Sequence, residues 1–158
     1  MAQSTAIVLW GDNGFHLGEK LHWRKFVLWE EATRVPLIVV PPAGFNAERR
    51  IDEPVSLIDI FPTMLDLAGI EMPVCDAVSL TRLIDDPSSS RGAPVVMTWG
   101  KGNHSVRLDR WRYTRYVDGT EELYDQSTDA YEWTNLAPNA AHRATCDRLK
   151  AALPADGA

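Results

Sequence analysis

The feature that most constrains the fold is a continuous apolar run over residues 5–10, which stops abruptly at residues 11–14, Gly-Asp-Asn-Gly. Such a run is typical of a strand buried on both faces, followed by a polar loop. Apolar residues then recur at helical spacing over residues 26–33, and Pro36 ends that pattern before a second apolar run at residues 37–40. The order strand, helix, strand predicts an α/β arrangement.

A second helix is predicted from an Asp59 cap to Gly69, with Pro62 among the first amides, where a missing N–H is tolerated. Its apolar face would consist of Ile60, Met64, Leu67 and Ala68. The acidic and serine-rich stretch at residues 85–90 is expected to be a linker or surface loop.

After residue 90 the pattern changes to short runs that are typical of antiparallel strands. Strands are predicted at residues 94–99, 105–108, 111–117 and 121–124, with a hairpin turn at Asp118-Gly119. A closing helix from Asn139 to Leu153 is expected to cover this small sheet. The chain should therefore divide into an α/β part, residues 1–90, and an α+β part, residues 91–158.

Composition excludes some classes of function. Sixteen Lys and Arg against 22 Asp and Glu give a net charge of −6, which argues against a general nucleic-acid binder. The apolar run at the start is too short for a signal peptide or a membrane span, so no membrane partner is expected. Targeting is absent or lies upstream, and periplasmic and cytoplasmic locations in a bacterium both remain open. Cys75 and Cys146 have no zinc or redox spacing and are expected to be free thiols.

Asp12 and Asn13 follow the first predicted strand, at the end where open α/β sheets commonly bind ligands. A carboxylate beside an amide oxygen suits Ca²⁺ or Mg²⁺. Because Ca²⁺ takes about six to eight oxygens, further ligands would have to come from elsewhere. The alternative is that these residues form a plain turn.

Charged residues cluster at positions 19–25. Lys25 could pair with an oxyanion held by the metal, or the cluster could be a solvated charge run with Trp23 packed into the core. His16 and His22 could bond a leaving-group oxygen or act as general acid, or could be structural hydrogen-bond partners.

Residues 11–25, followed by Glu-Glu-Ala-Thr-Arg-Val-Pro-Leu at residues 30–37, resemble the second signature region of the sulfatase family. The resemblance continues, in the family's order, through residues 55–70, 110–113, 122–125 and 132–136. It covers nearly the whole chain and is nearest to bacterial enzymes similar to iduronate or choline sulfatases. It implies part of an alkaline-phosphatase-like α/β sheet followed by a small antiparallel α+β subdomain.

Residue by residue, the resemblance implies that Asp12 and Asn13 are ligands of the active-site cation, usually Ca²⁺, with Mg²⁺ as the alternative. Lys25 would bind an oxygen of the sulfate ester, and Phe15, where relatives often have Trp, would face the substrate. Sugar, aryl and choline esters all remain open, and so does a phosphonate or phosphate monoester.

The family's nucleophile is a formylglycine made from Cys or Ser in a Cys/Ser-x-Pro-x-Arg motif. Neither cysteine begins such a motif, and residues 88–91, Ser-Ser-Ser-Arg, lack its proline. The resemblance therefore implies a carboxy-terminal portion that is inactive alone and is completed by a missing amino-terminal portion or a complementing chain. An uncovered sheet edge and self-association would follow. The alternative is a standalone, non-catalytic binding or assembly module.

Overall fold

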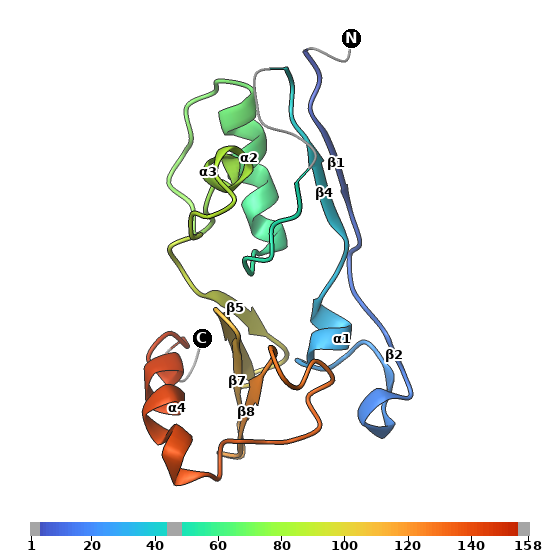
Figure 1. Cartoon of the computed structure of the whole chain (residues 1–158), viewed down its shortest axis with the longest axis vertical. Coiled ribbons are helices and arrows are strands. Elements are labelled where there is room, and N and C mark those ends of the chain that lie inside the picture. Colours follow the sequence, from blue (N-terminus) through green and yellow to red (C-terminus); the bar gives the residue numbers. More distant parts are fainter. Residues whose placement is uncertain (1–3, 44–48, 155–158) are drawn as a thin grey trace. The chain divides into compact units, whose positions relative to one another are not determined.

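The computed structural model describes residues 4–43 and 49–154 (Figure 1). Its strands are β1 Ile7–Trp10, β2 His16–Leu17, β3 Trp23–Arg24, β4 Leu37–Val40, β5 Val95–Thr98, β6 His104–Leu108, β7 Trp111–Arg115 and β8 Glu121–Asp125. Its α-helices are α1 Glu30–Thr33, α2 Ile60–Leu67, α3 Thr81–Asp85 and α4 Arg143–Lys150. Three 3₁₀ turns are η1 Glu19–Leu21, η2 Leu57–Asp59 and η3 Ala140–His142.

Contacts group the chain into two compact units, Met1–Trp10 with Pro36–Ala93, and Gly11–Val35 with Pro94–Ala158. The predicted division at residue 90 lies beside the Ala93–Pro94 boundary. The structure differs from that division in grouping residues 11–35 with the second unit. Within the described residues, no helix is long and apolar enough to cross a lipid bilayer.

In the first unit, β1 and β4 lie side by side as an antiparallel ribbon, with Ile7 opposite Val40 and Trp10 opposite Leu37 (Figure 1). Both predicted strands are confirmed, but burial of the first on both faces is wrong for this chain. Ile7 and Leu9 are 57% and 60% exposed. The reason is that, among the described residues, these two strands pair with no third strand.

The predicted helix at residues 59–69 is confirmed as α2, preceded by η2, and Asp59 is the N-cap residue of α2, although its side chain makes no capping hydrogen bond to that helix. Ser56 is the cap residue of a capping box in which the Asp59 carboxylate accepts the Ser56 N–H at 2.9 Å. Of the predicted apolar face, Ile60, Met64 and Leu67 are half-buried and Ala68 is exposed. Pro62 and Thr63 are the buried residues of α2, and the Thr63 hydroxyl accepts the N–H of Leu80 just before α3.

A buried ion pair holds this part of the first unit together. Arg91 donates two hydrogen bonds of 2.7 Å to the Asp59 carboxylate, which also accepts the Val78 N–H. Burial acts to raise the pKa of Asp59, but the hydrogen bonds from Arg91, Val78 and Ser56 outweigh it, so the pKa lies below its ordinary value. Asp59 is thus a structural carboxylate.

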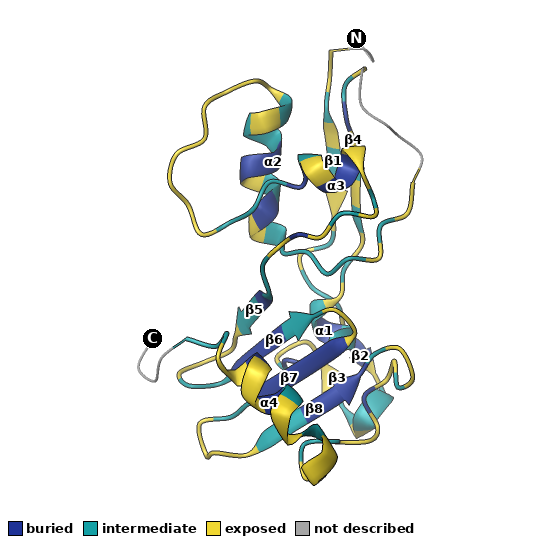
Figure 2. Ribbon diagram, turned by 60° about the vertical axis from the view of Figure 1, so that its left-hand side comes forward, coloured by how far each residue is buried: buried dark blue, intermediate teal, exposed yellow. Residues whose placement is uncertain are grey.

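In the second unit, β5, β6, β7 and β8 form a meander in that order, and their predicted antiparallel pairing is confirmed. The β7–β8 hairpin turns at Gly119, whose φ of 85° suits glycine, and its N–H donates to Tyr116 O. Helix α4 packs against β6 and β7 (Figure 2). The core between them is formed by Val106, Trp111, Tyr113, Leu123, Cys146 and Leu149. Both cysteines are free, as predicted, and Cys75 is exposed.

Candidate active-site segment

Three of the predicted site residues meet where the loop after β1, with Asp12 and Asn13, lies beside Lys25, which follows β3. The Asn13 N–H donates to Asp12 Oδ1 at 3.0 Å, and the Lys25 ammonium donates to Asn13 Oδ1 at 2.8 Å. Asp12 and Lys25 are exposed, whereas Asn13 is half-buried. The structure therefore joins residues 12 positions apart into one small cluster of opposite charges, which we call the site cluster.

The glycine that follows this pair is required by packing. A Cβ at Gly14 would lie 1.9 Å from the carbonyl oxygen of Glu31, and the Gly14 N–H donates to Ala32 O at 2.9 Å. Only glycine allows the loop to approach α1 this closely, and the hydrogen bond from Gly14 to Ala32 holds the loop against that helix. The Asp-Asn-Gly sequence thus does more than make a turn.

The donor types of the site cluster fit a hard divalent cation. The carboxylate of Asp12 and the amide oxygen of Asn13 are adjacent, and both are ligands that Ca²⁺ and Mg²⁺ prefer. In this structure the positive charge next to Asn13 Oδ1 is the Lys25 ammonium. Residues 4–43 and 49–154 contain no group of three or more His, Cys, Asp or Glu arranged to hold a metal. The cluster could therefore supply only part of a shell.

The two predicted histidines lie together around Trp29 instead of in the site cluster. The rings of His16 and His22 are 5.3 Å apart, and each lies 5.7 Å from the Trp29 ring. His16 is 1% exposed, and the Nε2 atoms of both histidines are buried without a hydrogen-bond partner. Phe15, in contrast, is 50% exposed and can form an apolar wall.

Lys20 has a structural role that the sequence did not reveal. Its ammonium lies 4.6 Å from the ring centroids of both Trp29 and Tyr124, and it donates to the Tyr124 hydroxyl and to the Glu132 carbonyl. Lys25 has no such enclosure. The alternative in which Trp23 anchors the charged cluster in the core is wrong, since Trp23 is 63% exposed.

A buried set of charges, which we call the anchoring cluster, attaches residues 28–30, at the start of α1, to β7. It consists of Glu30, Arg112 and Glu132. Arg112 forms ion pairs with both carboxylates and donates to Leu28 O at 2.8 Å, and Glu132 accepts the Glu30 N–H at 2.9 Å. The Arg112 Nε atom is 2.8 Å from Glu132 Oε1, an ion-pair contact without hydrogen-bond geometry.

The pKa values of the two carboxylates in the anchoring cluster are shifted in opposite directions. Burial raises the pKa of Glu132 above its ordinary value in spite of Arg112. Burial also acts to raise the pKa of Glu30, but Arg112 and Arg107 outweigh it, so that pKa is lowered. The sequence resemblance included Arg112 and Glu132 without indicating this contact.

Comparison with known proteins identifies the family. The Sulfatase family model matches residues 1–70. The chain is 41% identical to a sulfatase of Formosa agariphila over 97% of its own length and 30% of that protein. It is 31% identical to arylsulfatase K of Mus musculus, over 87% of this chain and 28% of that protein.

Solved structures give the same answer for the fold. The structure of a 2-O GAG sulfatase superposes with a TM-score of 0.83 and 27% identity, over 94% of this chain and 35% of that one. The predicted class is thereby confirmed, a part of the alkaline-phosphatase-like sulfatase fold with a small antiparallel α+β subdomain. The chain spans about 30% of the length of the curated relatives that it matches, and it belongs to the sulfatase family.

Proposed function

We propose that this chain is the carboxy-terminal region of a sulfatase, and that its site cluster contributes to sulfate ester hydrolysis. Asp12 and Asn13 would be ligands of a divalent cation, Ca²⁺ or Mg²⁺, and Lys25 would bind a sulfate oxygen. The observation that carries the proposal is the contact of 2.8 Å between Lys25 and Asn13, which joins an exposed ammonium to an amide oxygen that follows the Asp12 carboxylate in sequence.

A bound cation would polarise the sulfate group as a Lewis acid. Lys25 would donate a charge-assisted hydrogen bond to a sulfate oxygen and offset the charge that develops as the S–O bond breaks. Asp12 requires this arrangement, because its carboxylate would otherwise face a negative substrate. The close packing of Gly14 on α1 fixes the orientation of Asn13.

The other predicted site residues have supporting roles in this proposal. Phe15 would form an apolar wall beside the substrate, consistent with its exposure. His22 and His16 would bind substrate only through a change of their packing around Trp29, since both rings are now enclosed. The formylglycine nucleophile and the remaining metal ligands would be supplied outside this sequence, by the rest of a longer enzyme or by a complementing chain.

The length of the protein in its source cells separates this proposal from a standalone binding or assembly module. An antibody against residues 138–158 would detect the native polypeptide. A band several times heavier than 17.7 kDa supports a full sulfatase, whereas a band at 17.7 kDa supports the module unless a second polypeptide co-purifies.

The site cluster is then tested in the protein at its native length. Hydrolysis of 4-nitrophenyl sulfate should fall by about 10²–10³-fold in Lys25→Ala, the effect of removing one donor to a developing oxyanion. Lys150→Ala, which removes a lysine on α4, should leave the rate unchanged. Asp12→Ala should raise the Ca²⁺ concentration needed for half-maximal rate. Preferential hydrolysis of a phosphonate monoester would assign the other reaction of this fold.

A further inference from the structure

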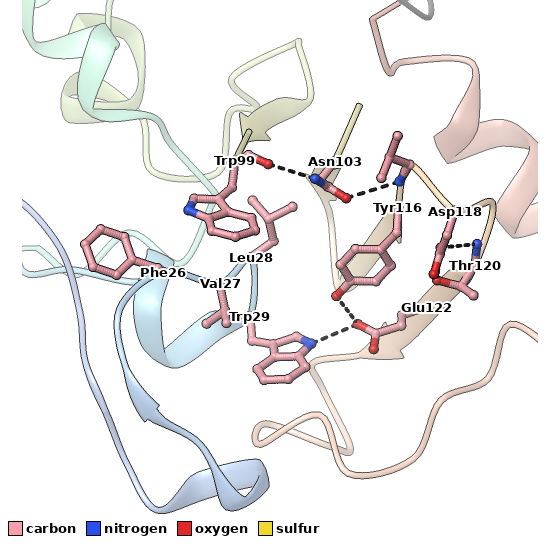
Figure 3. A pocket seen from close by; sticks show the side chains of 11 residues that line it. Phe26, Val27, Leu28, Trp29, Trp99, Asn103, Tyr116, Asp118, Thr120 and Glu122 are labelled. Atoms are coloured by element: carbon pink, nitrogen blue, oxygen red, sulfur yellow. Dashed lines mark hydrogen bonds between the residues drawn. The ribbon is translucent and has the colours of Figure 1, made fainter. Parts of the chain in front are cut away.

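The second unit contains a pocket that the site cluster does not use. Its volume is about 420 Å³, within the roughly 300–1,000 Å³ of small-molecule sites. It opens between the segment before α1 and the ends of the β5–β6 and β7–β8 hairpins (Figure 3). Its lining consists of Phe26, Val27, Leu28, Trp29, Trp99, Asn103, Tyr116, Val117, Asp118, Thr120 and Glu122.

Several hydrogen-bond donors of this lining are already used within the protein. The Trp29 Nε1–H and the Tyr116 hydroxyl both donate to Glu122 Oε2, at 2.8 and 3.0 Å (Figure 3). Burial and the nearby Glu122 raise the pKa of Tyr116, so its hydroxyl stays protonated and keeps this role. A hydroxyl-rich or anionic ligand would therefore find these donors occupied.

The same is true of the polar residues at the hairpins. The Asn103 amide donates to Trp99 O at 3.1 Å and accepts the Val117 N–H, and the Thr120 hydroxyl donates to Asp118 Oδ1 at 2.7 Å. The Lys20 ammonium already lies 4.6 Å from the Trp29 ring centroid, so the lining is left with the faces of its other aromatic rings and with two carboxylates, Asp118 and Glu122, that accept these hydrogen bonds. The lining contains no Lys or Arg among its 11 residues.

Aromatic faces combined with carboxylates attract positive charge and oppose negative charge. We propose that this pocket binds a small organic group that has an apolar face and no negative charge, with a positive charge on that group strengthening the binding. The rings of Trp99 and Phe26, which are half-exposed, would contact its apolar face.

The position of Phe26 connects the pocket with the site cluster. Its ring lines the pocket, and the Lys25 ammonium lies 5.9 Å from the ring centroid. A sulfate ester held by Lys25 can extend its alcohol part over this distance. If the proposed function holds, the pocket binds the alcohol part of the sulfate ester. It then selects esters whose alcohol part carries no second anionic group.

Three probes of the same ring size but different charge test the pocket without any catalysis. Benzyltrimethylammonium, benzyl alcohol and benzoate would each be titrated against the native-length protein, with affinity measured by ligand-observed NMR. We expect benzyltrimethylammonium to bind about threefold or more tightly than benzyl alcohol, the size of one cation–aromatic contact. Benzoate should bind weakest of the three. Equal affinities, or benzoate binding tightest, would overturn the inference.

Two variants and a control locate the binding. Trp99→Ala should abolish the preference for the cation, whereas Trp133→Ala, which removes an exposed tryptophan outside the lining, should not. Val117→Arg adds a positive charge to an exposed lining position and should raise benzoate affinity above that of the cation. If Trp99→Ala and Val117→Arg both leave the ranking unchanged, the probes bind elsewhere and the assignment is wrong.

The link to sulfate esters is measured separately. Benzyltrimethylammonium should compete with 4-nitrophenyl sulfate, and Trp99→Ala should raise KM for that ester while leaving kcat nearly unchanged. Absence of hydrolysis with any sulfate ester would contradict the proposed function. The order of the three probe affinities would still show whether the pocket prefers a cation. Hydrolysis that is unaffected by Trp99→Ala and by the competitor would refute the link alone.

Discussion

The second unit contains two sets of charged side chains that differ in burial and in how fully they are hydrogen-bonded. In the anchoring cluster, Arg112 is 2% exposed and has partners in Glu30, Glu132 and a backbone carbonyl. In the site cluster, Asp12 and Lys25 are exposed and are joined only through Asn13 among their described hydrogen bonds.

The difference follows from the cost of burying charge. A buried charge without partners is strongly destabilising, so the groups of the anchoring cluster have nearly all their bonding capacity used inside the protein. Such groups can fix a segment but cannot bind a ligand. The exposed groups of the site cluster remain hydrated and can exchange water for a cation or a sulfate oxygen.

The strongest test of this comparison is Arg112→Ala. Removing Arg112 leaves Glu132 buried without its cation and leaves Glu30 only the longer contact of 3.7 Å to Arg107, which should lower the free energy of unfolding by about 3–5 kcal/mol. Urea denaturation followed by tryptophan fluorescence measures the loss. Arg110→Ala, a neighbouring arginine with 57% side-chain exposure, should change it by less than about 1 kcal/mol.

A double-mutant cycle sharpens the same test. In the Arg112→Ala background, Glu132→Gln should cost less than it does alone, because it removes a carboxylate that has already lost its partner. Additive losses would mean that the two residues act independently, and the anchoring cluster would then not be a unit.

Gly14→Ala tests the connection between the two clusters. The added Cβ would lie 1.9 Å from Glu31 O, so backbone must move, and we expect a loss of about 3 kcal/mol in the same measurement. Gly69→Ala is the control, because Gly69 has φ of 67° but nothing within 4 Å of an added Cβ. It should cost only the smaller conformational penalty, about 1 kcal/mol. Equal losses would show that crowding at Gly14 is not decisive.

Local patterns were sufficient to predict much of the fold. Strands β5 to β8, the hairpin at Gly119 and the closing helix follow from periodicity and turn residues, which depend on neighbours in sequence. Burial of β1 could not be predicted in this way, because it depends on which strands lie beside the ribbon.

The candidate site shows the same limit. The residue types at positions 12, 13 and 25 indicated a cation and an oxyanion, and the structure brings these three together. The contact of Arg112 with Glu30 joins residues 82 positions apart, and no local pattern encodes it. The enclosure of Lys20 by Trp29 and Tyr124 was missed for that reason, although its aromatic neighbours in sequence were a weak signal.

Glu121 is an intermediate case, partly exposed but bonded by Tyr113, Arg143 and Lys150. The hydrogen bonds from Tyr113 and Arg143 lower its pKa from 4.5 to about 2. Because the folded state has the lower pKa, this stabilisation is complete above pH 4.5 and is lost as the pH falls toward 2. Allowing for solvent screening, we expect a loss of about 1 kcal/mol.

The measurement is the urea midpoint at pH 5, 4, 3 and 2. Glu121→Gln keeps the side-chain shape but removes the charge, so its midpoint should fall less steeply than that of the unchanged protein over this range. Parallel pH profiles would show that other carboxylates cause the loss and that Glu121 has the exposed character of the site cluster.

The smallest effect on stability is expected for Lys25→Ala. Its ammonium is exposed and makes one described hydrogen bond, to Asn13, so the free energy of unfolding should change by less than about 0.5 kcal/mol. Lys20→Ala is the matched control, because its ammonium is enclosed by two rings and bonds to Tyr124 and Glu132, and its loss should exceed that of Lys25→Ala several-fold. If the two lysines proved equally important for stability, Lys25 would be a structural residue. Lys25, the residue on which the proposed sulfate binding depends, would then resemble the buried groups of the anchoring cluster and not an exposed group that is free to bind a ligand.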